Sequence, residues 1–139
     1  MGARIRATPE VWQRWGEPDG DEPDLVIEHA GSVVGAIQFG EETDPRYRHA
    51  TIDLYLDPAV HGRGLGPDAV RAVARYLVTE RGHHRITIDP AADNEAAIRA
   101  YTKVGFRPVG VLRRYERGND GTWHDGLLME LLADELVVE

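Results

Sequence analysis

The chain has 139 residues, no cysteine and a formal net charge of −8 at pH 7. This length suits a single domain over residues 1–139, and the lack of thiols excludes disulfide scaffolds, cysteine-ligated metal sites and a thiol nucleophile. An acidic chain is not expected to bind nucleic acid, whose phosphates attract positive charge, and it favours a cationic small-molecule partner. No run approaches about 18 apolar residues and no apolar segment follows the N-terminus, so we expect no membrane span, no signal peptide and a cytoplasmic protein.

The N-terminal part of the sequence precedes the first clear β-rich run, which starts at Leu25. Residues 5–7 can form a stub of strand and residues 9–15 a short helix. Residues 17–24 (EPDGDEPD) hold five acids and two prolines. This composition is typical of a solvated loop, and it also fits part of an acidic rim for a cationic ligand.

Hydrophobic periodicity predicts the order of strands and helices. Two β-rich runs around a glycine-containing turn predict a hairpin, and residues 40–49 predict a polar loop. The next strand alternates strictly, with Ile52 on one face and Asp53 on the other. Two segments with helical spacing end at Gly82 and Gly105. The predicted elements are strands over residues 25–29, 33–39 and 50–56, a helix over 67–81, a strand over 85–89, a helix over 94–104, and strands over 106–115 and 123–131.

This order of elements predicts a mixed α+β fold. The central strand–helix–strand unit implies a right-handed parallel crossover, and the hairpins imply antiparallel flanks. We therefore expect a central mixed sheet with helices packed on both faces and with a shortened N-terminal region.

Three glycines alternate with other residues at the start of the first predicted helix, in residues 61–66 (HGRGLG). Glycine lets the backbone approach a bulky anion, and a helix N-terminus presents free N–H groups and the positive end of its dipole. The segment is therefore expected to bind phosphates, with Arg63 adding a positive charge. A P-loop would need Gly-Lys-Ser/Thr, and a dinucleotide fingerprint would need a longer last spacing. Spacing alone also allows a loop that uses glycine only for its turns.

Two segments together resemble the motifs of the GNAT N-acetyltransferase superfamily. Residues 61–66 resemble its pyrophosphate loop, Gln/Arg-x-x-Gly-x-Gly/Ala, and residues 94–106 resemble its second motif, N-x-x-A-x-x-x-Y-x-x-x-G-F. The resemblance implies that acetyl-CoA binds at the loop. His61 departs from the usual Gln or Arg, and Pro67 removes one backbone N–H. The residues implied for the cofactor are Leu54, Tyr55, Leu56, His61, Gly62, Arg63, Gly64, Leu65, Gly66, Asn94 and Tyr101.

The same resemblance implies direct transfer of an acetyl group from CoA to a primary amine. Asp53 and Asp89 are then the acids that bind the ammonium group or remove its proton, and Tyr101 protonates the CoA thiolate. Other interpretations stay open: the aspartates as cap or turn residues, Tyr101 as a core aromatic residue, and Asn94 as a helix cap. The six histidines show no metal-binding spacing, so we expect no metal.

Within that superfamily, residues 41–45, 52–53 and 87–101 resemble the aminoglycoside 6′-N-acetyltransferases. This resemblance implies the 6′-amino group of an aminoglycoside as acceptor. Related enzymes share several of these segments, so a polyamine, a peptide lysine, a siderophore precursor or a non-catalytic acyl-CoA-binding role are alternatives. Only 24 residues precede Leu25, so we expect an acceptor-side lid that is short, missing or completed by a second subunit in a homodimer. The residues implied for the acceptor are Glu41, Glu42, Asp44, Asp53 and Asp89.

Overall fold

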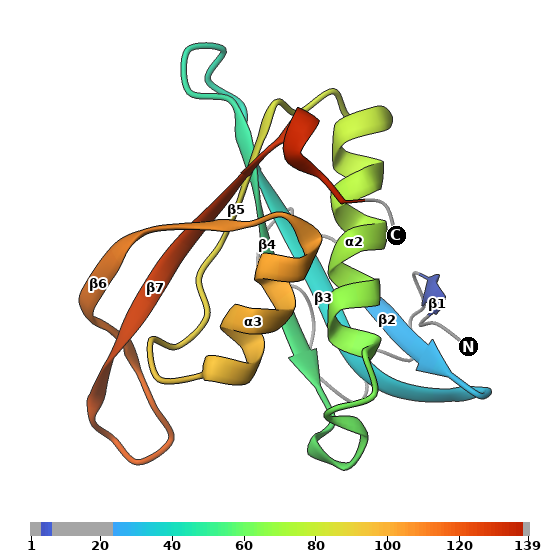
Figure 1. Cartoon of the computed structure of the whole chain (residues 1–139), viewed down its shortest axis with the longest axis vertical. Coiled ribbons are helices and arrows are strands. Elements are labelled where there is room, and N and C mark those ends of the chain that lie inside the picture. The colour runs from blue at the N-terminus through green and yellow to red at the C-terminus, as the bar shows by residue number, and fades with distance from the viewer. Residues whose placement is uncertain (1–3, 7–23, 138–139) are drawn as a thin grey trace.

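The computed structural model of the chain describes residues 4–6 and 24–137. Its centre is a seven-stranded sheet with the strand order β1-β2-β3-β4-β5-β7-β6 (Figure 1). Two helices pack against the sheet, so the mixed α+β fold expected from the sequence is confirmed. The strands are β1 (Arg4–Arg6), β2 (Asp24–His29), β3 (Ser32–Glu42), β4 (His49–Leu56), β5 (Arg85–Ile88), β6 (Arg107–Arg117) and β7 (Trp123–Leu132). The helices are α2 (Leu65–Thr79) and α3 (Glu95–Val104), with short 3-10 turns at Pro58–Val60 and Ala133–Glu135.

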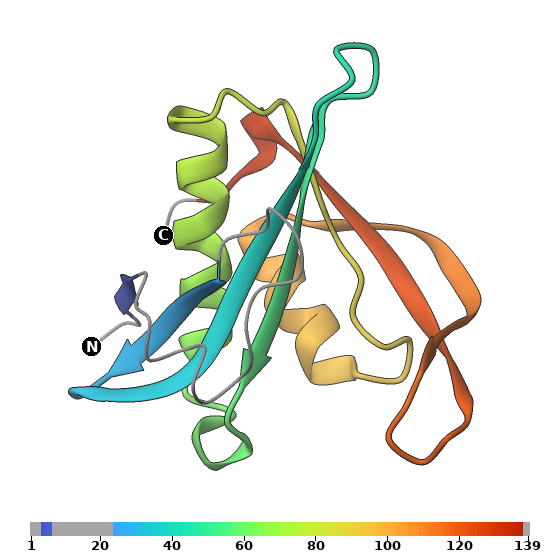
Figure 2. The same ribbon diagram turned by 180° about the vertical axis from the view of Figure 1, so that it is seen from behind.

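The crossover connections put both described helices on one face of the sheet. β4 and β5 are parallel neighbours joined through α2, and α3 leads from β5 to β6, which lies further along in the same direction across the sheet. Two right-handed crossovers that advance in the same direction place their helices on the same side, as the views from front and back show (Figures 1 and 2). The described helices thus cover one of the two faces on which the sequence predicted helices. The helix predicted over residues 9–15 and the acidic residues 17–23 lie outside the described residues.

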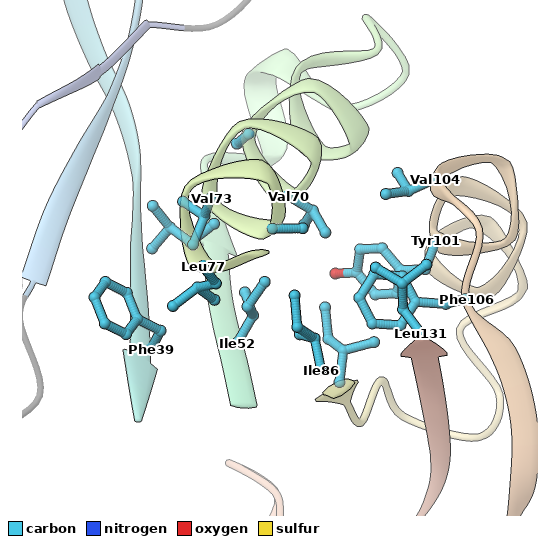
Figure 3. Close-up of a cluster of buried hydrophobic side chains, with 14 of the residues drawn as sticks. Phe39, Ile52, Val70, Val73, Leu77, Ile86, Tyr101, Val104, Phe106 and Leu131 are labelled. Carbon is cyan, nitrogen blue, oxygen red and sulfur yellow. The ribbon is translucent and has the colours of Figure 1, made fainter. Parts of the chain in front are cut away.

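The hydrophobic core lies between the helices and the sheet. Val70 and Leu77 of α2 face Ile52 of β4 and Ile86 of β5 (Figure 3). Each such side chain contributes about 1.5–3 kcal/mol when it is fully buried rather than exposed. Because strand residues alternate between faces, the neighbouring side chains of β4 and β5 point to the opposite face. No helix among the described residues is long and apolar enough to cross a membrane.

Some element boundaries differ from the expected ones where pairing or capping extends an element. β3 continues to Glu42 and β4 begins at His49, because the antiparallel register continues to that pair. The expected loop over residues 40–49 therefore shrinks to residues 43–48. α2 begins at Leu65 rather than Pro67, because Gly64 takes the N-cap position in a left-handed conformation with φ of 76°.

Strands β4 and β5 pair at only two residue positions. The first pair is Ala50 with Ile86 and the second is Thr51 with Thr87. A hydrogen bond of 2.8 Å joins the two threonine hydroxyls. Beyond this point β4 continues to Leu56 along β3, so a split separates the second half of β4 from β5 (Figure 1).

Candidate active site

A cleft of about 510 Å³ opens beside the split. It lies between the second half of β4, the glycine loop before α2, and one side of α3. Ten of the eleven residues that the sequence assigned to the cofactor line this cleft, and Arg63 is the exception. The lining residues are Leu54, Tyr55, Leu56, Pro58, His61, Gly62, Gly64, Leu65, Gly66, Pro67, Asn94, Ala96, Ala97, Arg99, Ala100, Tyr101 and Lys103.

Two left-handed glycines shape the loop over residues 61–66. Gly62 and Gly64 have φ of 82° and 76°, a conformation that glycine adopts without steric cost. The N–H groups of Leu65 and Gly66 at the start of α2 have no intrahelical acceptor. These donors and the positive end of the helix dipole make this wall of the cleft a site for anions.

His61 ties the glycine loop to the end of β4. Its ring Nε2 lies 3.0 Å from the carbonyl oxygen of Leu56. A carbonyl oxygen only accepts hydrogen bonds, so this nitrogen donates its N–H. His61 therefore uses one ring nitrogen to hold the loop in place.

Helix α3 forms the opposite wall of the cleft. Asn94 caps this helix, since its Oδ1 accepts a hydrogen bond of 3.1 Å from the N–H of Ala97, and it also lines the cleft. Tyr101 is only 8% exposed, and its ring lies edge-on to Phe106, with ring centroids 6.3 Å apart. The Tyr101 hydroxyl points away from Phe106 and toward α2 and β4 (Figure 3). Tyr101 is thus both a core aromatic residue and part of the cleft lining.

Two carboxylates lie on the face of the split opposite the helices. Asp53 and Asp89 each follow a paired threonine by two residues, so they occupy matching positions on the diverging strands. Asp53 Oδ2 accepts a hydrogen bond of 3.3 Å from Gln38 Nε2. Asp89 Oδ2 accepts one of 2.5 Å from the hydroxyl of Tyr115. Among the described residues, neither carboxylate forms an ion pair with a basic side chain.

The electrostatics of the site link its two faces. Burial raises the pKa of Asp89, the hydrogen bond from Tyr115 opposes this, and the charge of Asp53 adds to it. The pKa of Tyr101 is raised to about 12, first by burial and then by the charges of Asp53 and Asp89. The Tyr101 phenol therefore keeps its proton at neutral pH, as a proton donor requires. The two carboxylates therefore act electrostatically on the Tyr101 hydroxyl from the other face of the sheet.

The other acidic residues expected at the acceptor lie elsewhere. Glu41 and Glu42 pair with Ala50 and His49 at the turn end of the β3–β4 ribbon, and Asp44 follows them in the turn, so all three lie on the other side of the paired threonines from the split. Glu41 is bound by Arg81 and His83, at 2.9 and 2.6 Å, and Asp44 accepts a backbone N–H within its own turn. The structure does not bring these three together with the carboxylates at the split. The described residues also contain no group of three or more His, Asp or Glu side chains that could hold a metal ion.

Sequence reasoning missed four polar or charged side chains of the site. Gln38 and Tyr115 bind the two carboxylates, and Arg99 and Lys103 bring positive charge to the cleft lining. Gln38 could have been found from the register of the predicted hairpin, since it lies directly opposite Asp53. Tyr115 carries no local signal, because β6 approaches β5 only through the strand order β5-β7-β6.

Comparison with known proteins agrees with the two motif segments. The model of the acetyltransferase (GNAT) family matches residues 3–106. This range contains both diverging strands, the glycine loop and α3. The chain belongs to the GNAT acetyltransferase family. The resemblance seen in the sequence is thereby confirmed.

Named relatives of this GNAT chain differ in the acceptors that their names give. The chain is 37% identical over 111 residues to an aminoglycoside N(6′)-acetyltransferase type 1 of Klebsiella pneumoniae, across 79% of this chain and 52% of that one. It spans about half the length of the curated relatives that it matches. RimJ of Mycobacterium smegmatis, solved in complex with CoA-disulfide, aligns with a TM-score of 0.75 and 29% identity over 91% of this chain and 58% of that one. A dodecameric spermidine N-acetyltransferase of Vibrio cholerae shares the fold, with a TM-score of 0.78 and 21% identity over 95% and 94% of the two chains.

Proposed function

We propose that this GNAT chain transfers the acetyl group of acetyl-CoA to a primary amine of a cationic small molecule. The observation that carries the proposal is the arrangement at the split. An anion site lies on the helix face of the sheet, and two carboxylates without a basic partner among the described residues lie on the other face. The charges of both carboxylates raise the pKa of Tyr101. An anionic cofactor and a cationic acceptor can then meet at one gap in the sheet.

The cleft on the helix face suits CoA. The glycine loop and the start of α2 attract its pyrophosphate through backbone N–H groups and the helix dipole. Arg99 and Lys103 add positive charge to the same cleft. The second half of β4, which β5 does not cover, can bind the pantetheine arm as an added strand would bind. The RimJ relative solved with CoA-disulfide supports this assignment.

The residues at the split supply the proton transfers that the reaction needs. An ammonium group must lose a proton before its nitrogen attacks the thioester carbonyl, and we assign this step to Asp53 and Asp89. The raised pKa of Asp89 makes it a better proton acceptor than an ordinary aspartate. The amine nitrogen forms the new C–N bond, the C–S bond breaks, and Tyr101 gives its proton to the departing CoA thiolate. The nitrogen loses two protons on its way from ammonium to amide: one restores the proton that Tyr101 gives to sulfur, and the other is released to solvent.

The acceptor that we propose first is the 6′-amino group of aminoglycosides. The 37% identity to an aminoglycoside N(6′)-acetyltransferase supports it, as do the net charge of −8 and the paired carboxylates, which favour a polycation. Such an activity confers aminoglycoside resistance and fits the predicted cytoplasmic location. The homodimer expected from the sequence stays a prediction, which light scattering of the full chain can test.

The test follows release of free CoA from acetyl-CoA in the presence of different amines. The panel contains kanamycin-type aminoglycosides with a 6′-amino group, 6′-hydroxy analogues, spermidine and a short peptide with a free amino group. Saturable release with the 6′-amino compounds alone supports the proposed acceptor. Release with spermidine or the peptide alone replaces that acceptor but keeps the reaction. Binding of acetyl-CoA by calorimetry without release for any amine would favour a non-catalytic acyl-CoA-binding role.

A further inference from the structure

We propose that Tyr115 of β6 is a positioning residue for the acceptor site: its hydroxyl holds Asp89 and fixes the direction in which that carboxylate meets the ammonium group. The proposal rests on the proposed function and deepens it. Tyr115 lies outside both sequence motifs and beyond residues 3–106, which the family model matches. The contact that carries it is the hydrogen bond of 2.5 Å from the Tyr115 hydroxyl to Asp89 Oδ2.

The backbone of β6 is shaped to deliver this hydroxyl. The register between β6 and β7 breaks between Leu112 and Glu116, and Arg114 within the bulge has φ of 47°, where residues other than glycine are uncommon. The Arg114 N–H donates a hydrogen bond of 2.7 Å to Asp125 Oδ1, which holds the bulge against β7. Bulges re-aim side chains, and this one turns Tyr115 onto the face of the two carboxylates.

The Tyr115 ring lies against a glycine of β7. A Cβ added at Gly126 would lie 3.0 Å from Tyr115 Cδ2, which is tighter than an ordinary contact. Tyr115 is nevertheless 47% exposed, so burial of the ring explains little of this placement. The bulge and the glycine together place the Tyr115 hydroxyl within hydrogen-bond distance of Asp89.

The hydrogen bond changes how Asp89 can act on an amine. The side chains of the described residues that act on Asp89 are Tyr115 from β6 and Asp53 from β4, and the charge of Asp89 acts in turn on Tyr101 of α3. Strand β7 presents a glycine, and Glu116 adds negative charge beside Tyr115. Burial and the charge of Asp53 favour the protonated acid, whereas the hydrogen bond favours the carboxylate. The Tyr115 hydrogen bond therefore favours the charged form of Asp89, which attracts an ammonium group, against the net rise in the pKa of Asp89. Since one oxygen is held, the other keeps a fixed direction.

The first test measures the Asp89 carboxyl in the free protein. Tyr115→Phe removes only the hydroxyl, and Tyr47→Phe on the exposed β3–β4 turn is the matched control. Carbon-13 NMR titration of the carboxyl signals, with Asp89→Asn to assign them, follows the pKa of Asp89. We expect this pKa to rise by about one pH unit in Tyr115→Phe, because the charged form loses a hydrogen bond, and to stay unchanged in Tyr47→Phe. An unchanged pKa in Tyr115→Phe overturns the proposal.

The second test follows kcat/KM for the amine as a function of pH. In Tyr115→Phe we expect the acid limb to move to higher pH and kcat/KM near neutral pH to fall about tenfold, with KM for acetyl-CoA unchanged. A Tyr115→Phe profile equal to that of the parent protein overturns the positioning role even where the pKa moves. If the parent protein acetylates no amine, the proposed function fails, and the NMR titration alone still decides whether Tyr115 controls Asp89.

Discussion

The turn end of the β3–β4 ribbon and the split between β4 and β5 both carry acidic side chains, but only at the turn end are they paired with basic side chains. At the turn end, Glu41 lies 2.9 Å from Arg81 and 2.6 Å from buried His83. At the split, Asp53 and Asp89 occupy matching positions on the diverging strands, without a basic partner among the described residues. Hydrogen bonds from Arg81 and then His83 lower the pKa of Glu41, whereas burial raises the pKa of Asp89.

This difference separates a charge that stabilises the fold from charges kept for a ligand. Paired acids with satisfied hydrogen bonds support the native state, and removing Glu41 would leave buried His83 without its hydrogen-bond partner. Unpaired acids that repel each other cost stability, and proteins retain that cost mainly at functional sites. Removing a charge should therefore lower the stability of the fold at the turn end and raise it at the split.

The largest effect is expected on turnover, from Asp53→Asn and Asp89→Asn. Each variant loses a group that we propose to bind the ammonium or take its proton, so kcat/KM for the amine should fall about 100-fold to 10,000-fold. Affinity for acetyl-CoA, measured by calorimetry, should hardly change, because the cofactor cleft lies on the other face. Glu80→Gln, at the exposed end of α2, is the control. Unchanged turnover in either aspartate variant would remove that residue from the mechanism.

At the turn end, the expected loss is of stability. Glu41→Gln leaves Arg81 and His83 without their carboxylate, so the free energy of unfolding in urea should fall by about 1–3 kcal/mol. Glu80→Gln should stay within about 0.5 kcal/mol of the parent protein. A stable Glu41→Gln variant with weakened amine binding would instead support the acceptor role that the sequence suggested.

The contributions of Asp89 and Glu41 to the stability of the fold should depend on pH with opposite signs. The pKa of Asp89 is raised by folding, so its stabilising contribution is present below its unfolded pKa of about 4 and is lost as pH rises through the folded pKa. Thermal unfolding should therefore show Asp89→Asn more stable than the parent near pH 7, with a smaller gain at lower pH. The pKa of Glu41 is lowered, so its contribution is present above the unfolded pKa and is lost as pH falls through the folded pKa. The loss in Glu41→Gln should shrink on acidification, and parallel trends for the two variants would contradict this assignment.

The smallest effect is expected from the glycine under Tyr115. Gly126→Ala introduces a Cβ 3.0 Å from the ring, so the ring must shift by a fraction of an ångström and its hydrogen bond to Asp89 weakens. We expect kcat/KM for the amine to fall about twofold to fivefold, since catalysis depends on placement at this scale. Gly110→Ala on β6 is the matched control, because a Cβ there meets nothing within 4 Å. Equal kinetics for the two alanine variants would show that the ring position does not matter.

Features that depend on neighbouring residues could be predicted from the sequence. Strict alternation places Ile52 and Asp53 on opposite faces of β4, so the sequence alone predicts which face of that strand is buried. Three glycines ahead of an amphipathic helix indicated the loop, and helical spacing indicated that Asn94 and Tyr101 share α3 or its cap. These are short-range consequences of backbone periodicity and glycine conformation.

Features that depend on pairing between distant strands could not be predicted from the sequence. Glu41 meets His83 across 42 positions, and Tyr115 meets Asp89 across 26, in both cases through pairings that need the strand order. The bulge at Arg114 depends on the register between β6 and β7, and no residue type in this segment predicts it. That both described helices lie on one face could not be predicted for the same reason, since the direction of the second crossover depends on where β6 joins the sheet.

The split between β4 and β5 also allows both substrates of the proposed reaction to be bound at the same time. Acetyl-CoA can occupy the cleft beside α2 and α3 while the amine approaches from the opposite face, so neither has to leave before the other binds. The chain has no cysteine on which an acetyl group could wait. Initial rates at several fixed concentrations of each substrate should therefore give intersecting double-reciprocal lines, the pattern of a ternary complex. Parallel lines would mean that the acetyl group rests on the protein between two half-reactions.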